Sequence, residues 1–240
     1  MFQNVVPINK ERHAAIRIKD LTDFSFAAQF HIAYVTMHEF MRGASAFPVV
    51  FLEDKEKGEF RPVALLGLNA GENLFVDALG QWQGPYVPAI IRRHPFALAP
   101  AAQDGQFVVC IDEDSAVVSQ SAGAPLFDEQ GAPTQVLENV KRYLIEMQKM
   151  DALTQQFCRF LATHQLFTPL NMRVRDIDKV KNVAGCFVVN EERVNQLSDE
   201  LHLEMKRQGY LAPVYAQLIS LTQIERLVKL QDEKKAVALW

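Results

Sequence analysis

Between residues 60 and 98, apolar runs only a few residues long alternate with turns that contain glycine and proline. Residues 61–68 and 74–76 are predicted strands, because each is apolar and is bounded by turn-forming residues. A charged turn at 53–59 precedes them and predicts a hairpin with a buried strand at 49–52. Parallel strands need long crossover connections, which these short turns do not provide. The spacing therefore predicts an antiparallel sheet, curled or barrel-like, and not a series of βαβ units.

The rest of the first half fits the same β-rich organisation. Residues 4–9 predict an edge strand, because Pro7 has no N–H to donate to a neighbouring strand. Residues 14–18 alternate between apolar and polar side chains, as a short strand does. A further strand is predicted at 106–111. Two helices are expected in this half, a short one at 25–28 and one at 37–46 that ends before a proline.

The second half changes character after a loop at 112–133 that is rich in acidic, Ser, Gly and Pro residues. Apolar residues then recur at helical spacing from Val136 to about residue 166, which predicts one long helix. The shorter elements predicted after it are strands at 172–174 and 186–189 and helices at 191–196, 198–209 and 210–230.

Together these elements predict an α+β protein. The β-rich part covers residues 1–112 and the helix-rich part covers residues 133–230. Because strands recur at 172–189, we expect both parts to share one domain, residues 1–230. Residues 231–240 are expected to form a flexible tail.

The composition argues against several classes of function. The formal net charge is −4, whereas sequence-independent nucleic-acid binders need a basic surplus to neutralise phosphate. Cys110, Cys158 and Cys186 are far apart and form no CxxC pair, which predicts buried, reduced thiols and no metal site. The first 20 residues lack a signal-peptide pattern, and no apolar run has the roughly 20 residues of a transmembrane helix. We therefore expect a cytoplasmic protein.

The sequence also lacks the common catalytic motifs GxSxG, GxGxxG and the P-loop. His31 and His38 would lie about 10 Å apart on a helix, too far for one metal ion. His202 and Glu204 match two ligands of a facial iron triad, but no histidine follows to supply the third. We therefore predict no cofactor, and a binding protein is favoured over an enzyme.

Five residues form the candidate binding surface, and they lie within a stretch of 13: Trp82, Tyr86, Arg92, Arg93 and His94. Aromatic rings next to arginines provide stacking surfaces and recognise carboxylates. These residue types are also enriched at protein interfaces. The alternative is a partly buried aromatic turn whose arginines pair with the acidic residues at 112–114.

Asp112, Glu113 and Asp114 directly follow a predicted buried strand. Carboxylates at the end of a strand can bind a cation or act as an acid or base. Successive side chains of an extended chain point to opposite sides, so these three carboxylates cannot all face one ion. A solvated turn, with one acid capping the backbone, is the favoured alternative. Asp112 and Asp114 complete the set of candidate site residues.

Several longer runs closely resemble the SapC family of bacterial proteins, and the resemblance extends over nearly the whole chain to about Leu230. The runs are RPVALLGLNAGENLFVD, GPYVPAIIRRHPFAL, CIDEDS, PLFDEQGAPT, GCFVVNEERVNQL and GYLAPVYAQLISLTQIERL. Two departures are Ala78–Gly80, where the family has a D-G turn, and His94, where an aromatic residue is more common. The second departure argues against an essential chemical role for His94.

The resemblance implies a binding or helper role. The name of the family ties it to surface-layer proteins. Its members resemble accessory proteins encoded near outer-membrane receptors and near peptide- or tryptophan-modifying functions. No catalytic residue comes with the resemblance.

The leading hypothesis is an accessory protein that binds a peptide or protein partner related to the surface layer or the envelope. Its contact surface would be residues 82–94. The alternative is an enzyme with a spatially assembled acid–base site, acting on a small or peptidyl substrate. In that site, Asp112, Asp114 and the Arg92–His94 segment would supply the chemistry. A third alternative is a homodimer joined through the C-terminal helix.

Overall fold

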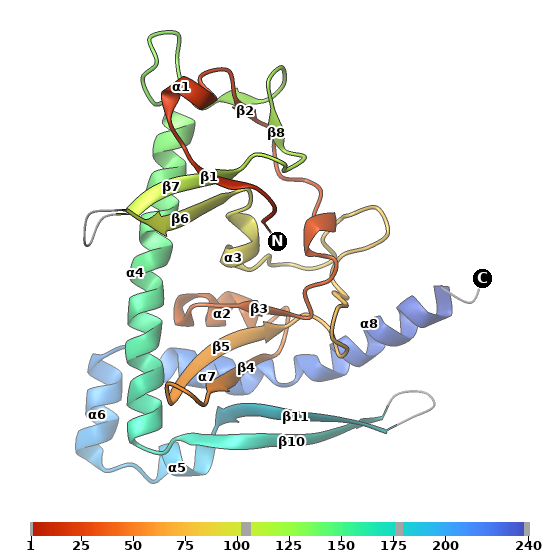
Figure 1. Ribbon diagram of the computed structural model, residues 1–240. Helices are drawn as coiled ribbons and strands as arrows, with labels where there is room; N and C mark the ends of the chain where they lie inside the picture. The colour runs from red at the N-terminus through yellow and green to blue at the C-terminus, as the bar shows by residue number, and fades with distance from the viewer. Residues whose placement is uncertain (1, 102–106, 176–179, 238–240) are drawn as a thin grey trace. The chain divides into compact units, whose positions relative to one another are not determined.

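The structure is a computed structural model that describes residues 2–101, 107–175 and 180–237 (Figure 1). The chain divides into two compact units. The first unit contains Met1–Phe24 and Ala89–Lys149, and the second contains Ser25–Pro88 and Met150–Trp240. The chain therefore leaves the first unit, returns to it, and leaves it again within helix α4 (Gln135–Thr163).

The first unit is built on a three-stranded antiparallel sheet in the order β1-β7-β6. Its strands are β1 (Val5–Pro7), β7 (Phe107–Asp112) and β6 (Phe96–Pro100). A smaller sheet in the order β8-β2-β9 consists of β8 (Val118–Ser119), β2 (Arg17–Ile18) and β9 (Ala124–Pro125). Two single-turn helices belong to this unit, α1 (Lys10–His13) and α3 (Ala89–Arg92).

The core of the first unit lies between these sheets and the N-terminal half of α4. Leu137 and Leu144 are seven residues apart, so they lie on one face of the helix two turns apart. They pack with the buried strand residues Phe96 and Ile111, and with Leu126 from the 112–133 segment. The apolar period read from the sequence thus places α4 against the sheet.

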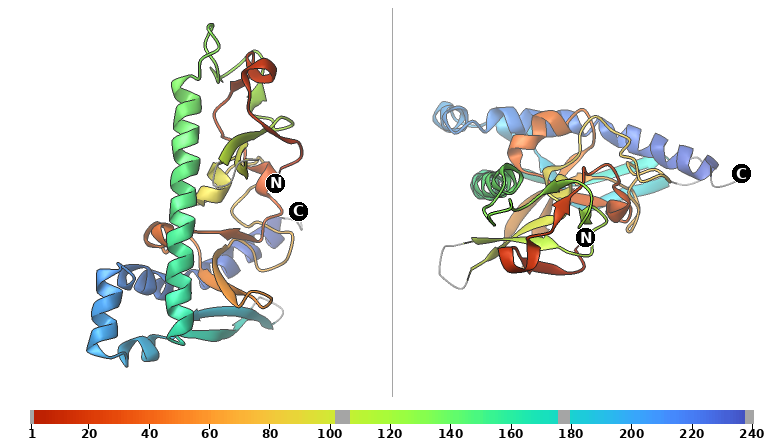
Figure 2. Two further views of the ribbon diagram at one scale, coloured as in Figure 1. Left: turned by 60° about the vertical axis from the view of Figure 1, so that its left-hand side comes forward. Right: turned by 90° about the horizontal axis from the view of Figure 1, so that it is seen from above.

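The second unit contains a five-stranded antiparallel sheet in the order β10-β11-β4-β5-β3. The strands are β3 (Ile32–Tyr34), β4 (Val49–Asp54), β5 (Glu59–Leu65), β10 (Phe167–Arg175) and β11 (Val180–Val189). The helical elements are η1 (Ser25–Ala27), η2 (Met37–Glu39), α2 (Phe40–Gly43), α5 (Glu191–Asn195), α6 (Asp199–Arg207), α7 (Leu211–Ser220) and α8 (Gln223–Val237). Helix α7 contacts β4 and β11, and α8 runs beside the β10–β11 hairpin (Figure 2).

A cluster of aromatic rings fills the core of the second unit. Phe51 lies 4.7 Å from Phe167 between ring centroids, and Phe157 packs edge-on against Phe40. Strands β4 and β11 have one register pair in the described residues, Phe187↔Phe51. The side chain of Gln217 on α7 supplements the contact between these two strands, because it bonds to the backbone of both.

The predicted fold class is confirmed, because strands predominate in the first half and helices in the second. The sheets are open, so the barrel-like alternative is wrong. The predicted hairpin is β4–β5, and the long helix is α4. The predicted helix at 37–46 is the short pair η2 and α2. Gln106, the first residue of the predicted strand at 106–111, lies outside the described residues.

Two predicted elements are wrong. Residues 74–76 do not form a strand, because only Val76 makes a β-bridge, to Trp82. The helix predicted at 210–230 is divided into α7 and α8. At the break, the hydroxyls of Ser220 and Thr222 donate to backbone carbonyls three residues earlier, at 2.5 and 2.8 Å. Such bonds compete with helix continuation. The described part of the predicted tail, 231–237, belongs to α8.

Candidate functional site

The structure places the seven predicted site residues in different units. The second unit holds Trp82 and Tyr86. The first unit holds the other five: Arg92, Arg93, His94, Asp112 and Asp114. The continuous stretch 82–94 therefore crosses the boundary between the two units, after Pro88.

Trp82 and Tyr86 make contacts within the second unit. The Trp82 Nε1–H donates to the Tyr86 carbonyl at 3.0 Å, and its ring stacks on Phe75 at 5.6 Å between centroids. The Tyr86 hydroxyl donates to Oε1 of buried Glu39 at 2.9 Å. The other carboxylate oxygen of Glu39 accepts the backbone N–H of Thr36. Both aromatic side chains thus use their polar groups to hold this loop in place.

Helix α3 positions the arginines of the first unit. Its last turn is closed by the Arg93 N–H, which donates to the Ala89 carbonyl at 3.1 Å. The same carbonyl accepts the Tyr143 hydroxyl from α4 at 3.1 Å. The Arg92 guanidinium lies 5.9 Å from the centre of the Tyr143 ring, within the range of cation–π attraction. A cis peptide bond joins His94 to Pro95 before β6 begins.

A pocket of about 310 Å³ lies beside these residues, and we call it the arginine pocket. Its charged and aromatic lining comes from α3 and the residues after it, from β6, from α4 and from the segment after β2. It is lined by Ile18, Lys19, Asp20, Leu21, Arg92, Arg93, His94, Pro95, Phe96, Val117, Asn139, Val140, Tyr143 and Leu144. Three of these side chains are cationic at neutral pH and one is acidic, so the pocket favours an anion.

Arg93 has an unsatisfied hydrogen-bond donor beside this pocket. Its Nε is buried and has no hydrogen-bond acceptor among the described residues. Its guanidinium lies 5.4 Å from the centre of the Phe2 ring, and burial lowers the pKa of the Arg93 side chain. Burying an N–H donor without an acceptor is costly. An anion bound beside Arg93 would remove that cost.

His94 is buried next to the arginines, with 7% of its surface exposed. Its Nε2 lies 2.7 Å from the Ser115 hydroxyl, and its ring stacks on Phe2 at 5.9 Å between centroids. Burial lowers the pKa of His94 below its ordinary value, so the imidazole is neutral at pH 7. In this contact, the Nε2 of the neutral imidazole donates to the serine hydroxyl or accepts from it, depending on the tautomer.

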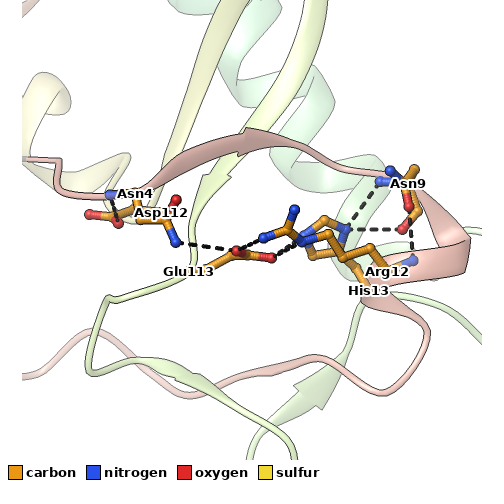
Figure 3. Close-up of polar contacts among 6 residues, drawn as sticks. All are labelled: Asn4, Asn9, Arg12, His13, Asp112 and Glu113. Atoms are coloured by element: carbon orange, nitrogen blue, oxygen red, sulfur yellow. Dashed lines mark hydrogen bonds and ion pairs between the residues drawn. The ribbon is translucent and has the colours of Figure 1, made fainter.

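The acidic segment turns toward the N-terminus of the chain (Figure 3). Buried Asp112 accepts the backbone N–H of Gln3 at 3.0 Å and that of Asn4 at 2.9 Å. Glu113 accepts from Arg12 Nε at 2.6 Å and lies 3.2 Å from Nε2 of buried His13.

Asp114 is exposed. In the part of the chain that the structure describes, none of the three carboxylates at 112–114 pairs with Arg92 or Arg93. The alternative in which these arginines pair with the acidic segment is therefore wrong.

The residues that the N-terminal segment brings to this unit were not among the predicted site residues. Phe2 packs against both Arg93 and His94, and Arg12 and His13 hold Glu113. Their separation from residues 92–113 in the sequence gives no local signal of these contacts. The one sequence signal that bears on these contacts is the charged run at 10–13, whose basic residues are candidate partners for the acidic segment at 112–114.

Two further findings limit the chemistry of the described residues. No group of three His, Cys, Asp or Glu side chains among them is arranged to hold a metal ion. None of the helices in the same residues has both the length and the apolar character needed to cross a membrane.

A family model named SapC matches residues 8–227 of the 240-residue chain. The chain belongs to the SapC family. The match includes every residue that lines the arginine pocket, whereas Phe2 and the two N–H donors to Asp112 precede it. Searches of curated proteins and of solved structures found no match to this SapC protein.

Proposed function

We propose that this SapC protein is an accessory protein that binds a peptide or protein partner through an acidic group of that partner. The acidic group occupies the arginine pocket, where Arg93 and Arg92 receive a carboxylate. The link between the SapC family and surface layers favours an envelope or surface-layer protein as the partner, met in the cytoplasm before export.

The observation that carries this proposal is the buried Nε of Arg93, which lacks an acceptor among the described residues. A guanidinium recognises a carboxylate through two parallel N–H donors, which combines charge with a fixed direction. The arginine pocket, at about 310 Å³, is at the lower end of the size range of ligand sites. A Glu or Asp side chain or a peptide C-terminus fits such a volume better than a large cofactor does.

The test uses the full chain as bait in native lysate, with captured proteins quantified by mass spectrometry. Wild type is compared with Arg93→Gln, which removes the charge, and with Arg207→Gln. Arg207 is an exposed residue at the end of α6 and serves as the matched control. We expect one stoichiometric partner that Arg93→Gln captures at least about tenfold less, the effect of one charge-assisted hydrogen bond.

The result that overturns the proposal is equal capture by a folded Arg93→Gln variant. Circular dichroism and urea unfolding establish that this variant is folded. Trp82→Ala is unsuitable as the primary test, because Trp82 holds its own loop through Tyr86. Replacing single acidic residues of the captured partner by their amides then identifies the group that enters the pocket.

A second candidate function rests on the 2.7 Å contact between His94 Nε2 and the Ser115 hydroxyl. A neutral histidine that accepts a serine proton is the arrangement that activates a nucleophile. In this alternative, the protein is an enzyme acting on an anionic substrate that the arginines hold. A fluorophosphonate probe would label wild type and not Ser115→Ala. Absence of labelling on wild type would exclude the activated serine.

A further inference from the structure

A second pocket, of about 610 Å³, lies in the first unit and shares no lining residue with the arginine pocket. We call it the apolar pocket. One wall is the β1-β7-β6 sheet and the other is α4. Leu137, Lys141 and Ile145 of α4 line it at intervals of four residues, which places them on one face of the helix.

The sheet wall consists of apolar side chains from β6, from β7 and from the residue just after β1. Leu98 on β6 is paired with Val109 on β7, and the N–H of Ile8, just after β1, donates to the Val109 carbonyl at 2.9 Å. These three side chains pack on the core of the first unit, together with buried Phe127 and Leu137. The apolar pocket therefore lies at the solvent-accessible edge of the hydrophobic core of the first unit.

Two large apolar side chains at this edge are half exposed. Phe107 and Ile145 each leave 49% of their surface accessible, and both line the apolar pocket. Exposed apolar residues that occur singly on a surface need no explanation, but two beside one pocket indicate a ligand or a partner. The volume of the pocket is well within the range of small-molecule sites.

The charged residues that line the apolar pocket are both cationic. Lys10 and Lys141 line it, and none of its lining residues is acidic. Lys141 is paired with Glu138 at 2.7 Å, whereas Lys10 has no carboxylate partner in the described parts of the chain. An apolar cavity with one available ammonium at its edge is complementary to a molecule that is apolar along its length and anionic at one end.

We propose that the apolar pocket binds a straight-chain fatty acid, with the acyl chain between the sheet and α4 and the carboxylate at Lys10. The apolar walls recognise the hydrocarbon through burial of its surface. Lys10 selects the carboxylate over a neutral head group, because a charge-assisted hydrogen bond forms only with the anion. This site is independent of the arginine pocket and of the function proposed for it.

The experiment is calorimetric titration of the full chain with decanoate and with decan-1-ol, both below their micellar or solubility limits. We expect one decanoate per chain and at least about tenfold weaker binding of the alcohol, the loss of one charge-assisted contact. Lys10→Met should weaken decanoate binding by a similar factor and leave decan-1-ol unchanged. Lys149→Met is the matched control, because Lys149 is an exposed lysine on α4 that does not line the pocket.

Ile145→Asp provides a second variant that keeps the fold, because Ile145 is half exposed. Its carboxylate should abolish decanoate binding. Three results would overturn the proposal: no saturable decanoate binding, binding that both Lys10→Met and Ile145→Asp leave intact, or equal affinity for decan-1-ol. A dimer that light scattering detects and that decanoate does not dissociate would instead assign this face to a second copy of the chain.

Discussion

Asp112 accepts the backbone N–H of Asn4 at 2.9 Å, across 108 residues of sequence. The same carboxylate accepts the N–H of Gln3, and the register pair Val5↔Asp112 continues the contact into the sheet. Asp112 is the last residue of β7, and its side chain holds the backbone just before β1 in place. This contact explains why an acidic side chain is buried at the end of an apolar strand.

The first prediction concerns this carboxylate. Asp112→Ala should lower the free energy of unfolding by about 1.5–3 kcal/mol, because it removes two hydrogen bonds to a charged acceptor. Urea unfolding of the purified variants measures the loss. Asp114→Ala is the control and should change stability by less than about 0.5 kcal/mol, since Asp114 is exposed. Equal effects of the two substitutions would show that the Asp112 contact is not stabilising.

The second prediction concerns pH. Hydrogen bonds from Arg12 hold the pKa of Glu113 below its ordinary value. A carboxyl whose pKa is lowered by folding stabilises the protein above its unfolded pKa, about 4.3, and loses that contribution as the pH falls through the folded pKa. The stability difference between wild type and Glu113→Gln should thus be constant near pH 6–7 and shrink below about pH 4.3.

The measurement for this second prediction is the free energy of unfolding between pH 7 and pH 3. Glu11→Gln is the control, because Glu11 lies on α1 beside Arg12 and is exposed. A wild type to Glu113→Gln difference that stays constant down to pH 3 would contradict the coupling between Glu113 and Arg12.

The third prediction concerns Gln217, a buried polar residue on α7. Its side-chain amide donates to the Val49 carbonyl at 2.9 Å, and its oxygen accepts the Val189 N–H at 3.1 Å. Gln217 thus links β4 to β11, which share one register pair in the described residues, Phe187↔Phe51. Gln217→Met keeps the volume but removes both bonds, and should cost about 2–3 kcal/mol. Gln208→Met, at an exposed position, should be close to neutral in the same urea titration.

The fourth prediction concerns the cysteines, which are buried and reduced as expected. Burial raises the pKa of Cys158 to about 12. At pH 8, only about one Cys158 side chain in 10,000 is then a thiolate, the form that reacts. Iodoacetamide should therefore leave Cys158 unmodified in the folded protein and modify it in urea, as peptide mass spectrometry reports. Fast modification of Cys158 in the native state would contradict this burial.

The sequence by itself determined the features that depend on neighbours along the chain. The charged turn at 53–59 predicted the β4–β5 hairpin, and the apolar period predicted α4. Helices α5 and α6 begin close to the predicted starts at 191 and 198, where the Asn190 side chain accepts the Arg193 N–H and the Ser198 side chain accepts the Leu201 N–H. These signals are local, because a turn, a helical period and a cap each involve residues within a few positions of one another.

Only the tertiary structure decided which residues form a site. Trp82 and Arg93 are 11 positions apart but belong to different units, whereas Arg93 and Phe2 are 91 positions apart and in contact. The arginine pocket likewise collects Lys19, the Arg92–His94 segment and Tyr143. The free energy of such contacts comes from burial and charge pairing between distant segments, and no local pattern in the sequence records which segments meet.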